Sequence, residues 1–299
     1  MASNIAWELY RSFLSVLTEG SLSGAARTLG VAQPTVGRHI ETLEKSLGLV
    51  LFTRSQAGLM PTEAALALKP HAEAMESTAA ALERAAASQG EGVHGVVRVT
   101  ASDVVGVEVL PPVVAALRRQ YPDLKVELVL TNRVQDLLHR EADIAVRMTK
   151  PTQKQLIARH VGKIEVGMFA STEYVKRYGK PDSLDALQAH SLIGFDRPNA
   201  FVRSAAKSLQ GLDREMFSVR ADNDLAQLAL IRAGTGIGIC QVALAKRSGL
   251  VRLLSKQFQL HLETWITMHE DLRHSPRCRV TFDALAEGLQ RHARGLALS

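Results

Sequence analysis

The sequence predicts an α/β fold in which a winged helix-turn-helix precedes two α/β lobes. Three observations support this prediction. The first sixty residues hold three short amphipathic segments, followed by two short apolar runs around a polar turn. A long alanine-rich segment comes next. From residue 95 onward, strand-like apolar runs alternate with helical patterns in two successive blocks.

Length and composition set the outer bounds. The chain has 299 residues, enough for about two domains, and 46% of them are hydrophobic and 22% charged, as in ordinary globular proteins. Two cysteines are too few for a disulfide framework or a four-cysteine metal site, which favours a reducing compartment. The sequence starts without a signal-peptide pattern and holds no apolar run of about 18 residues. We therefore expect a cytoplasmic protein with no membrane partner.

Two short helices open the chain. The spacing of the apolar residues predicts a helix over residues 7–19, and Gly20 suits its carboxyl end. Ser21 is a suitable N-cap for a second helix, which Gly30 ends about two turns later. The apolar face of the first helix consists of Leu9, Phe13, Val16 and Leu17.

A third helix is predicted from Gln33 to about Leu47, because Pro34 fits the first turn and Gly48 follows. Its outward residues are polar and compact enough to enter a DNA major groove. Two short apolar runs, 51–54 and 58–60, then predict a β-wing on which Arg54 would reach a phosphate. A helix-turn-helix alone is a weak pattern, since many helix pairs mimic it, but the wing and the Gln-Pro entry make this one specific.

The stretch from Phe13 to Thr62 closely resembles the amino-terminal domain of LysR-type transcriptional regulators. The matching residues include Gly20-Ser21-Leu22-Ser23-Gly24-Ala25-Ala26, Gln33-Pro34-Thr35-Val36, Leu47-Gly48 and Leu51-Phe52. One departure is Gly37, where the family usually has serine. The domain is expected at residues 1–62, and its candidate DNA contacts are Ser23, Gln33, Pro34, Thr35, Gly37, Arg38, His39 and Arg54.

The net charge does not carry the DNA prediction. Thirty-six Lys and Arg against thirty Asp and Glu give +6 and a sequence pI near 9.5, which suggests nucleic acid. Residues 1–90, however, hold seven basic and eight acidic residues, or 7 − 8 = −1. The basic surplus therefore lies in the rest of the chain, and the DNA prediction rests on the helical pattern and a few placed cations.

A linker helix is expected over residues 63–89, with Thr62 as its N-cap. Pro70 lies too deep for the first turn, so a kink or a restart is expected there. The resemblance implies that two copies pair along this helix. The alternative is a single amphipathic helix packed on its own chain. The proposed pairing seam is spaced as in a coiled coil and consists of Leu68, Ala72, Met75, Ala79 and Leu82.

Residues 90–299 are expected to form two α/β lobes around a cleft. The first lobe would take about 92–163 and 267–299, and the second about 164–266. This part resembles the effector-binding domain of the same family, which is similar to periplasmic binding proteins. The resemblance rests on Asp143-Ile144-Ala145-Val146-Arg147 and on Ala233-Gly234-Thr235-Gly236-Ile237-Gly238.

Candidate effector contacts follow from the rule that ligands bind at the carboxyl ends of strands in open α/β sheets. A helix that begins after Ser102 would favour an anion, and Arg147 would form a bidentate pair with a carboxylate. The alternatives are a surface salt bridge for Arg147 and a helix N-cap for Thr131. The expected effector is small and anionic, and the candidate contacts are Ser102, Asp103, Thr131, Arg147, Phe195 and Asn223.

No catalytic constellation is present in the sequence, so neither an enzyme nor a cofactor or metal is expected. The glycine cluster at 234–238 follows a helix and precedes a strand, the reverse of a dinucleotide fingerprint. Cys240 lies in an apolar strand and is expected to be inert. We expect a regulator that binds an interrupted-dyad operator as a dimer of dimers, with double-stranded DNA, a small effector and RNA polymerase as candidate partners. The alternatives are a small-molecule-binding protein or enzyme with an accessory helical domain, or an architectural DNA-binding protein without a ligand.

Overall fold

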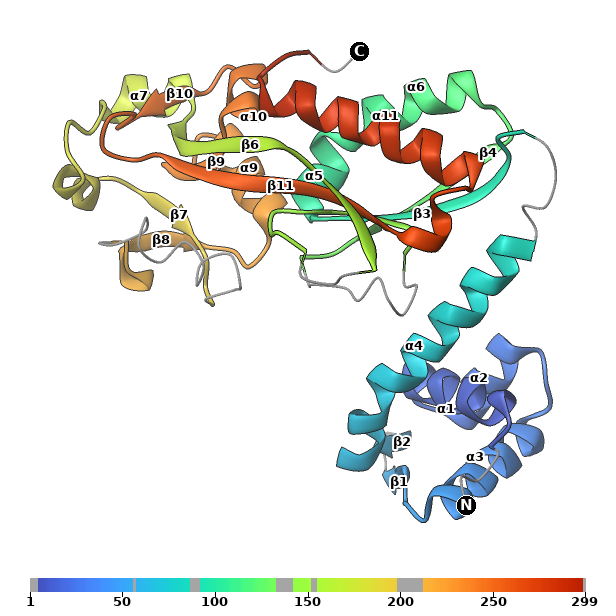
Figure 1. The fold of residues 1–299 in the computed structure, drawn as a ribbon. Coiled ribbons are helices and arrows are strands. Elements are labelled where there is room, and N and C mark those ends of the chain that lie inside the picture. Colours follow the sequence, from blue (N-terminus) through green and yellow to red (C-terminus); the bar gives the residue numbers. More distant parts are fainter. Residues whose placement is uncertain are drawn as a thin grey trace. The chain divides into compact units, whose positions relative to one another are not determined.

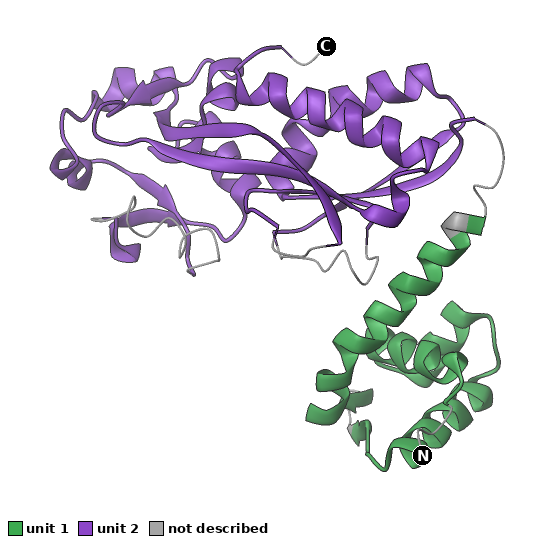
Figure 2. Cartoon of the chain, in the orientation of Figure 1, with its two compact units in different colours: residues 1–86, 139–141 green, residues 87–138, 142–299 purple. Residues whose placement is uncertain are grey.

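The computed structural model describes residues 5–55, 58–86, 92–132, 142–151, 155–197 and 212–297. The described chain forms two compact units, one that ends at Ala86 and one that begins beyond it (Figure 2). Among the described residues, no helix is long and apolar enough to cross a membrane.

The first unit begins with the three expected helices. They are α1 (Trp7–Glu19), α2 (Leu22–Leu29) and α3 (Gln33–Leu47). Ser21 caps α2 by accepting a hydrogen bond from the amide of Gly24 at 3.1 Å. The glycines that follow the three helices adopt left-handed conformations, which only glycine adopts without strain. The core of this unit is built on fully buried side chains of all three helices, including Phe13, Val36 and Leu43.

The predicted wing is an antiparallel hairpin of β1 (Phe52–Ser55) and β2 (Gly58–Pro61). Glu44 of α3 anchors it, because one carboxylate oxygen accepts the amides of Leu51 at 2.6 Å and Phe52 at 3.3 Å. The amide of Leu59 also donates to the carbonyl of Gly20 at 3.1 Å. The wing is therefore fixed to α3 and to the turn between α1 and α2.

A single long helix, α4 (Glu63–Ala86), completes this unit. Thr62 caps it, since its hydroxyl accepts the amide of Ala65 at 3.2 Å. Pro70 lies inside the helix, which continues past it, so of the two predicted outcomes, a kink or a restart, the restart does not occur. Proline removes one backbone donor there without ending the helix.

The second unit is built on a mixed sheet (Figure 1). Its parallel part pairs one strand with two neighbours, as the strand–helix–strand pattern predicts. Two helices follow the first of these strands, and a helix predicted over 134–139 lies outside the described residues. These elements are β3 (Gly95–Ala101), β4 (Leu124–Leu130), β5 (Ile144–Arg147), α5 (Asp103–Glu108) and α6 (Leu110–Gln120).

Two long antiparallel strands, β6 (Leu156–Ala170) and β11 (Leu260–His269), run from one lobe into the other. The strand order is β10-β6-β11-β5-β3-β4, with β9 paired to β6. A separate two-stranded parallel sheet joins β7 to β8. The remaining strands are β7 (Leu192–Gly194), β8 (Phe217–Arg220), β9 (Gly238–Gln241) and β10 (Val251–Leu253).

Helices cover the sheet in both lobes. The first lobe, as the term is used below, contains β3–β5, α5, α6 and α11, and the second contains β7–β10, α7, α9 and α10. Buried residues of α11 pack against β3, β6, β11 and α6. The helices not yet given are α7 (Thr172–Tyr178), α9 (Asp224–Arg232), α10 (Val242–Arg247) and α11 (Pro276–Ala293).

Candidate DNA-binding and effector-binding sites

The first half of α3 presents the candidate DNA-reading residues. Gln33, Pro34 and Arg38 are exposed, and Thr35 and Gly37 are half-buried. Buried Val36, Ile40 and Leu43 hold the opposite face of α3 in the core. The exposed face is thus a rigid polar surface of the size that a major groove accepts.

The amino ends of α2 and α3 meet at this surface. The hydroxyl of Ser23 donates to the side-chain oxygen of Gln33 at 3.1 Å, and both side chains are exposed. Arg54 is exposed on β1 of the wing. The structure therefore brings Ser23 and Gln33 together and places Arg54 on a separate element.

His39 differs from its prediction. It was expected to point outward, but its ring is half-buried and its Nδ1 lies 2.7 Å from the hydroxyl of Ser12. Ser12 is a buried residue of α1. His39 ties α3 to α1, because its helical position lies on the flank beside buried Val36 and Leu43 rather than on the exposed face.

The proposed pairing seam of α4 divides into two parts. Ala72 is 3% exposed and Leu68 is partly buried, and both pack against the core of their own unit. Ala72 is therefore covered by its own unit, and Leu68 is partly covered by it. Met75 and Leu82 are 41% and 72% exposed, and Ala79 between them is half-buried. The exposed seam is thus Met75, Ala79 and Leu82.

Three predicted effector residues follow neighbouring strands of the first lobe: Ser102 after β3, Thr131 after β4 and Arg147 at the end of β5. The amide of Thr131 donates to the carbonyl of Ala101 at 3.0 Å. The guanidinium of Arg147 donates to the hydroxyl of buried Thr100 and to the carbonyl of Val146, both at 2.8 Å. The carboxyl ends of β3, β4 and β5 therefore lie together, as predicted.

Asn132, which the sequence did not single out, connects this edge to the second lobe. Its side-chain amide donates to carboxylate oxygens of Asp103 and Asp224, each at 3.2 Å. The side chain of Asn223 caps α9 and also reaches Asp103 at 3.4 Å. We call Asp103, Asn132, Asn223 and Asp224 the amide–carboxylate cluster.

This cluster is acidic. Burial is the main cause that raises the pKa of Asp224, and the negative charge of Asp103 adds to it, while the hydrogen bond from Asn132 acts in the opposite direction. The amino end of α5, which was expected to attract an anion, is thus accompanied by carboxylates of the chain itself, and so is the amino end of α9. The anionic-effector prediction loses its support at Ser102 and keeps it at Arg147.

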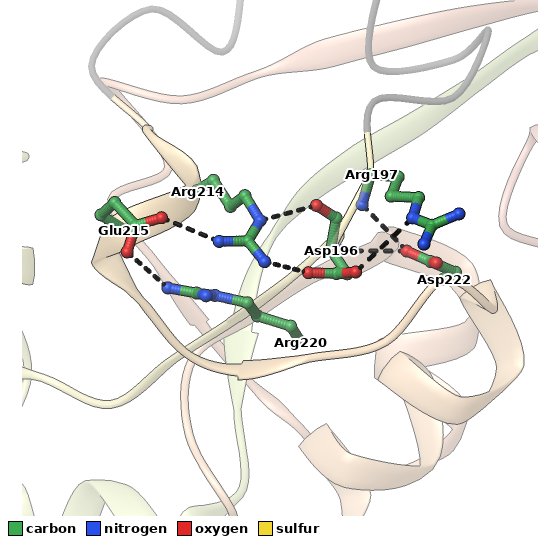
Figure 3. Close-up of polar contacts among 6 residues, drawn as sticks. All are labelled: Asp196, Arg197, Arg214, Glu215, Arg220 and Asp222. Atoms are coloured by element: carbon green, nitrogen blue, oxygen red, sulfur yellow. Dashed lines mark hydrogen bonds and ion pairs between the residues drawn. The ribbon is translucent and has the colours of Figure 1, made fainter.

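A network of ion pairs and hydrogen bonds in the second lobe includes Asp196 and Asp222, the chain neighbours of the predicted site residues Phe195 and Asn223 (Figure 3). One oxygen of Asp222 accepts the amides of Asp196 and Arg197 at 3.1 and 3.0 Å. The segment after Phe195 is therefore held beside the residue that precedes Asn223. Arg214 contacts Asp196 and Glu215, and Arg220 contacts the other oxygen of Glu215 at 3.0 Å.

Neither metal binding nor thiol chemistry finds support in the part of the chain that the structure describes. No group of three or more His, Cys, Asp or Glu residues there is arranged to hold a metal ion. Burial raises the pKa of the Cys240 thiol to about 12, which keeps it protonated and unreactive.

Comparisons with known proteins agree with both halves of the chain. Residues 7–66 match the bacterial regulatory helix-turn-helix protein, lysR family, and residues 90–290 match the LysR substrate binding domain. The transcriptional regulator CrgA of Neisseria meningitidis serogroup C is 28% identical over 285 residues, which cover 93% of this chain and 95% of CrgA.

Solved structures show the same fold. A structure of CrgA from Neisseria meningitidis aligns over 94% of this chain and 98% of its own, with 27% identity and a TM-score of 0.58. Full-length CbnR in complex with its target DNA aligns over 96% of this chain and 99% of its own, with 19% identity and a TM-score of 0.65. The CbnR match supports the fold alone. Because family matches cover both the helix-turn-helix and most of the second unit, this chain belongs to the LysR family of transcriptional regulators and is not an enzyme.

Proposed function

We propose that this regulator reads its operator through the exposed first half of α3 and that the wing adds phosphate contacts through Arg54. The observation that carries the proposal is the pairing of a rigid buried face with an exposed polar face on α3. The operator is an interrupted dyad, because two α3 helices of one assembly would reach two half-sites. The proposed DNA contacts are Ser23, Gln33, Pro34, Thr35, Gly37, Arg38 and Arg54, with His39 in a supporting position.

Arg38→Ala tests this interface. Loss of a base or phosphate contact of arginine is expected to weaken operator binding by about 1–3 kcal/mol. The measurement is a gel shift with DNA from upstream of the protein's own gene. Arg11→Ala makes the same chemical change at an exposed position of α1 and should leave the affinity unchanged. Equal affinity of the Arg38→Ala variant and the wild type would rule out α3 as the reading helix.

We further propose that a small effector binds where the two lobes meet, at Ser102, Asp103, Thr131, Arg147, Phe195 and Asn223, with Asn132 as an added contact. Arg147 favours a carboxylate on the ligand, and the amide–carboxylate cluster favours hydrogen-bond donors. Carboxylates, amino acids and amines can be compared in a thermal-shift screen. A shift produced by amines alone would overturn the role of Arg147.

The regulator is proposed to act in the cytoplasm as a dimer of dimers, with the exposed seam of α4 joining two copies. RNA polymerase is its proposed partner at the promoter. Support for the assembly comes from Met75 and Leu82, large apolar side chains left exposed in the described chain. Support for the compartment comes from the family function, which requires access to DNA.

A further inference from the structure

Helices α5 and α9 come from different lobes and lie side by side (Figure 1). Their first residues meet, since Asn223 at the start of α9 reaches Asp103 at the start of α5. Their last residues meet as well, since Arg232 of α9 contacts Glu108 of α5. The two helices therefore run parallel and join the lobes at both ends.

The contact at the carboxyl ends is strongly attractive. Arg232 donates two hydrogen bonds to the carboxylate of Glu108, at 2.6 and 3.0 Å, and a third to the hydroxyl of Ser248 at 3.0 Å. Arg247 donates to the backbone carbonyl of Glu108 at 2.8 Å. The hydrogen bond from Arg232 holds the pKa of Glu108 below its usual value, so this carboxyl is charged at neutral pH. We call Glu108, Arg232 and Arg247 the arginine node.

A shared core supports the same side of the lobe boundary. Leu228 and Leu244 of the second lobe are 2% and 0% exposed and belong to the apolar cluster of the first lobe, together with Val105 and Val109. Separating the lobes along this line would expose these side chains to water. Relative movement of the lobes must therefore leave this side closed.

The contact at the amino ends of the two helices is weaker, because it brings two carboxylates together. Asp103 and Asp224 carry like charges, and their side-chain donors are the neutral amides of Asn132, which reaches both, and Asn223, which reaches Asp103. Among the described residues, no basic side chain pairs with these two carboxylates, whereas Arg232 and Arg247 both bind Glu108 at the other end. The amide–carboxylate cluster is thus the end that separates at least cost.

We propose that the paired helices α5 and α9 form a clamp between the lobes. The arginine node is its fixed end, and the lobes move relative to each other when the contact at the opposite end, at Asp103 and Asp224, opens or closes. The link from this movement to effector binding rests on the proposed function. The clamp itself does not, because the contacts that define it lie within the second unit.

The experiment measures the distance between the lobes in the full-length protein, without DNA or effector. Spin labels are placed on cysteines introduced at exposed Arg119 of α6 and Lys176 of α7, and labelled chains are diluted with unlabelled protein. The native thiols are unsuitable for labelling, because Cys278 is fully buried and the pKa of Cys240 is about 12. Pulsed double electron–electron resonance then gives the distance distribution.

Glu108→Arg is expected to produce a second distance population, and the charge swap Glu108→Arg with Arg232→Glu is expected to restore the wild-type distribution. Asp224→Asn removes the like charge at the opposite end and is expected to narrow the distribution. Glu173→Arg, the same change at an exposed site of α7, is the control. Glu108→Gln serves if circular dichroism shows that the arginine variant does not fold.

A wild-type distribution for both Glu108 variants would overturn the proposal, and so would failure of the charge swap to restore the distance. Operator binding by the same variants is measured separately. If neither the variants nor the wild-type protein bind the operator, the proposed operator function fails. The distance measurement still decides whether the clamp exists.

Discussion

Single residues show how far local chemistry could be predicted. The caps Ser21 and Thr62 were predictable, because a helix start needs a side-chain acceptor at a fixed place in the sequence. Glu44 and Asn132 were not, because their hydrogen-bond partners lie in other elements. His39 was misjudged for a related reason. The helical pattern gives the approximate face of a residue, but the partner that turns a flanking ring inward comes from α1.

Gly37 makes a stability prediction at the same scale. Its missing Cβ would lie 3.8 Å from a methyl group of Leu22, which is ordinary van der Waals contact. Gly37→Ala is therefore expected to stabilise the first unit by about 0.5–1 kcal/mol, the usual helix-propensity difference. Gly24→Ala is the opposite control, because its Cβ would lie 2.8 Å from Cβ of Glu19 and should destabilise. Urea unfolding of the two variants decides whether the signs differ.

At the scale of elements, the sequence predicted most of the fold because the responsible signals are local. Apolar spacing, caps and terminal glycines located α1, α2 and α3, and strand–helix alternation located the parallel part of the sheet. The seam of α4 was harder to predict. Apolar spacing shows that a stripe is buried but not by what, and Leu68 and Ala72 turned out to pack on their own unit. The amide–carboxylate cluster depends on how two lobes meet, which no local pattern encodes.

The exposed seam of α4 predicts an assembly effect. Leu82→Glu or Met75→Glu places a charge on the apolar stripe that is left exposed and should lower the oligomer mass in sedimentation. Leu66→Glu is the matched control, because Leu66 is 54% exposed and lies on the opposite side of the same helix from Met75. An unchanged mass for both seam variants would place the interface between copies elsewhere.

At the scale of the whole molecule, charge is distributed against the simplest expectation. The DNA-binding part carries a net charge near zero, and the surplus of basic residues lies in the effector part. Part of that surplus is engaged within the fold, as the arginine node and the network around Arg214 show. Each DNA-binding unit is therefore expected to make only a few phosphate contacts, so operator binding should depend moderately on salt concentration. Affinity must then come from joining several units in one assembly.

The second unit should also lose stability in acid because of His292. This side chain is 2% exposed, its Nε2 lies 2.7 Å from the side-chain oxygen of Gln241, and burial, with a smaller effect of Arg247, lowers its pKa from 6.5 to about 4. The unfolded chain therefore binds more protons than the folded one between these two pH values. The stabilisation is fully present above pH 6.5 and is lost as the pH falls toward 4, by about 3 kcal/mol in all.

Urea unfolding of the Trp7→Phe protein, followed by the fluorescence of Trp265 in the second unit, measures this dependence. Adding His292→Gln should flatten the curve between pH 6.5 and 4, because glutamine does not titrate. His261→Gln, at an exposed site of β11, should leave the slope in place. A slope that survives His292→Gln would mean that the acid sensitivity of this unit arises from other groups. Asp224 is not one of them, because its raised pKa makes its contribution run in the opposite direction.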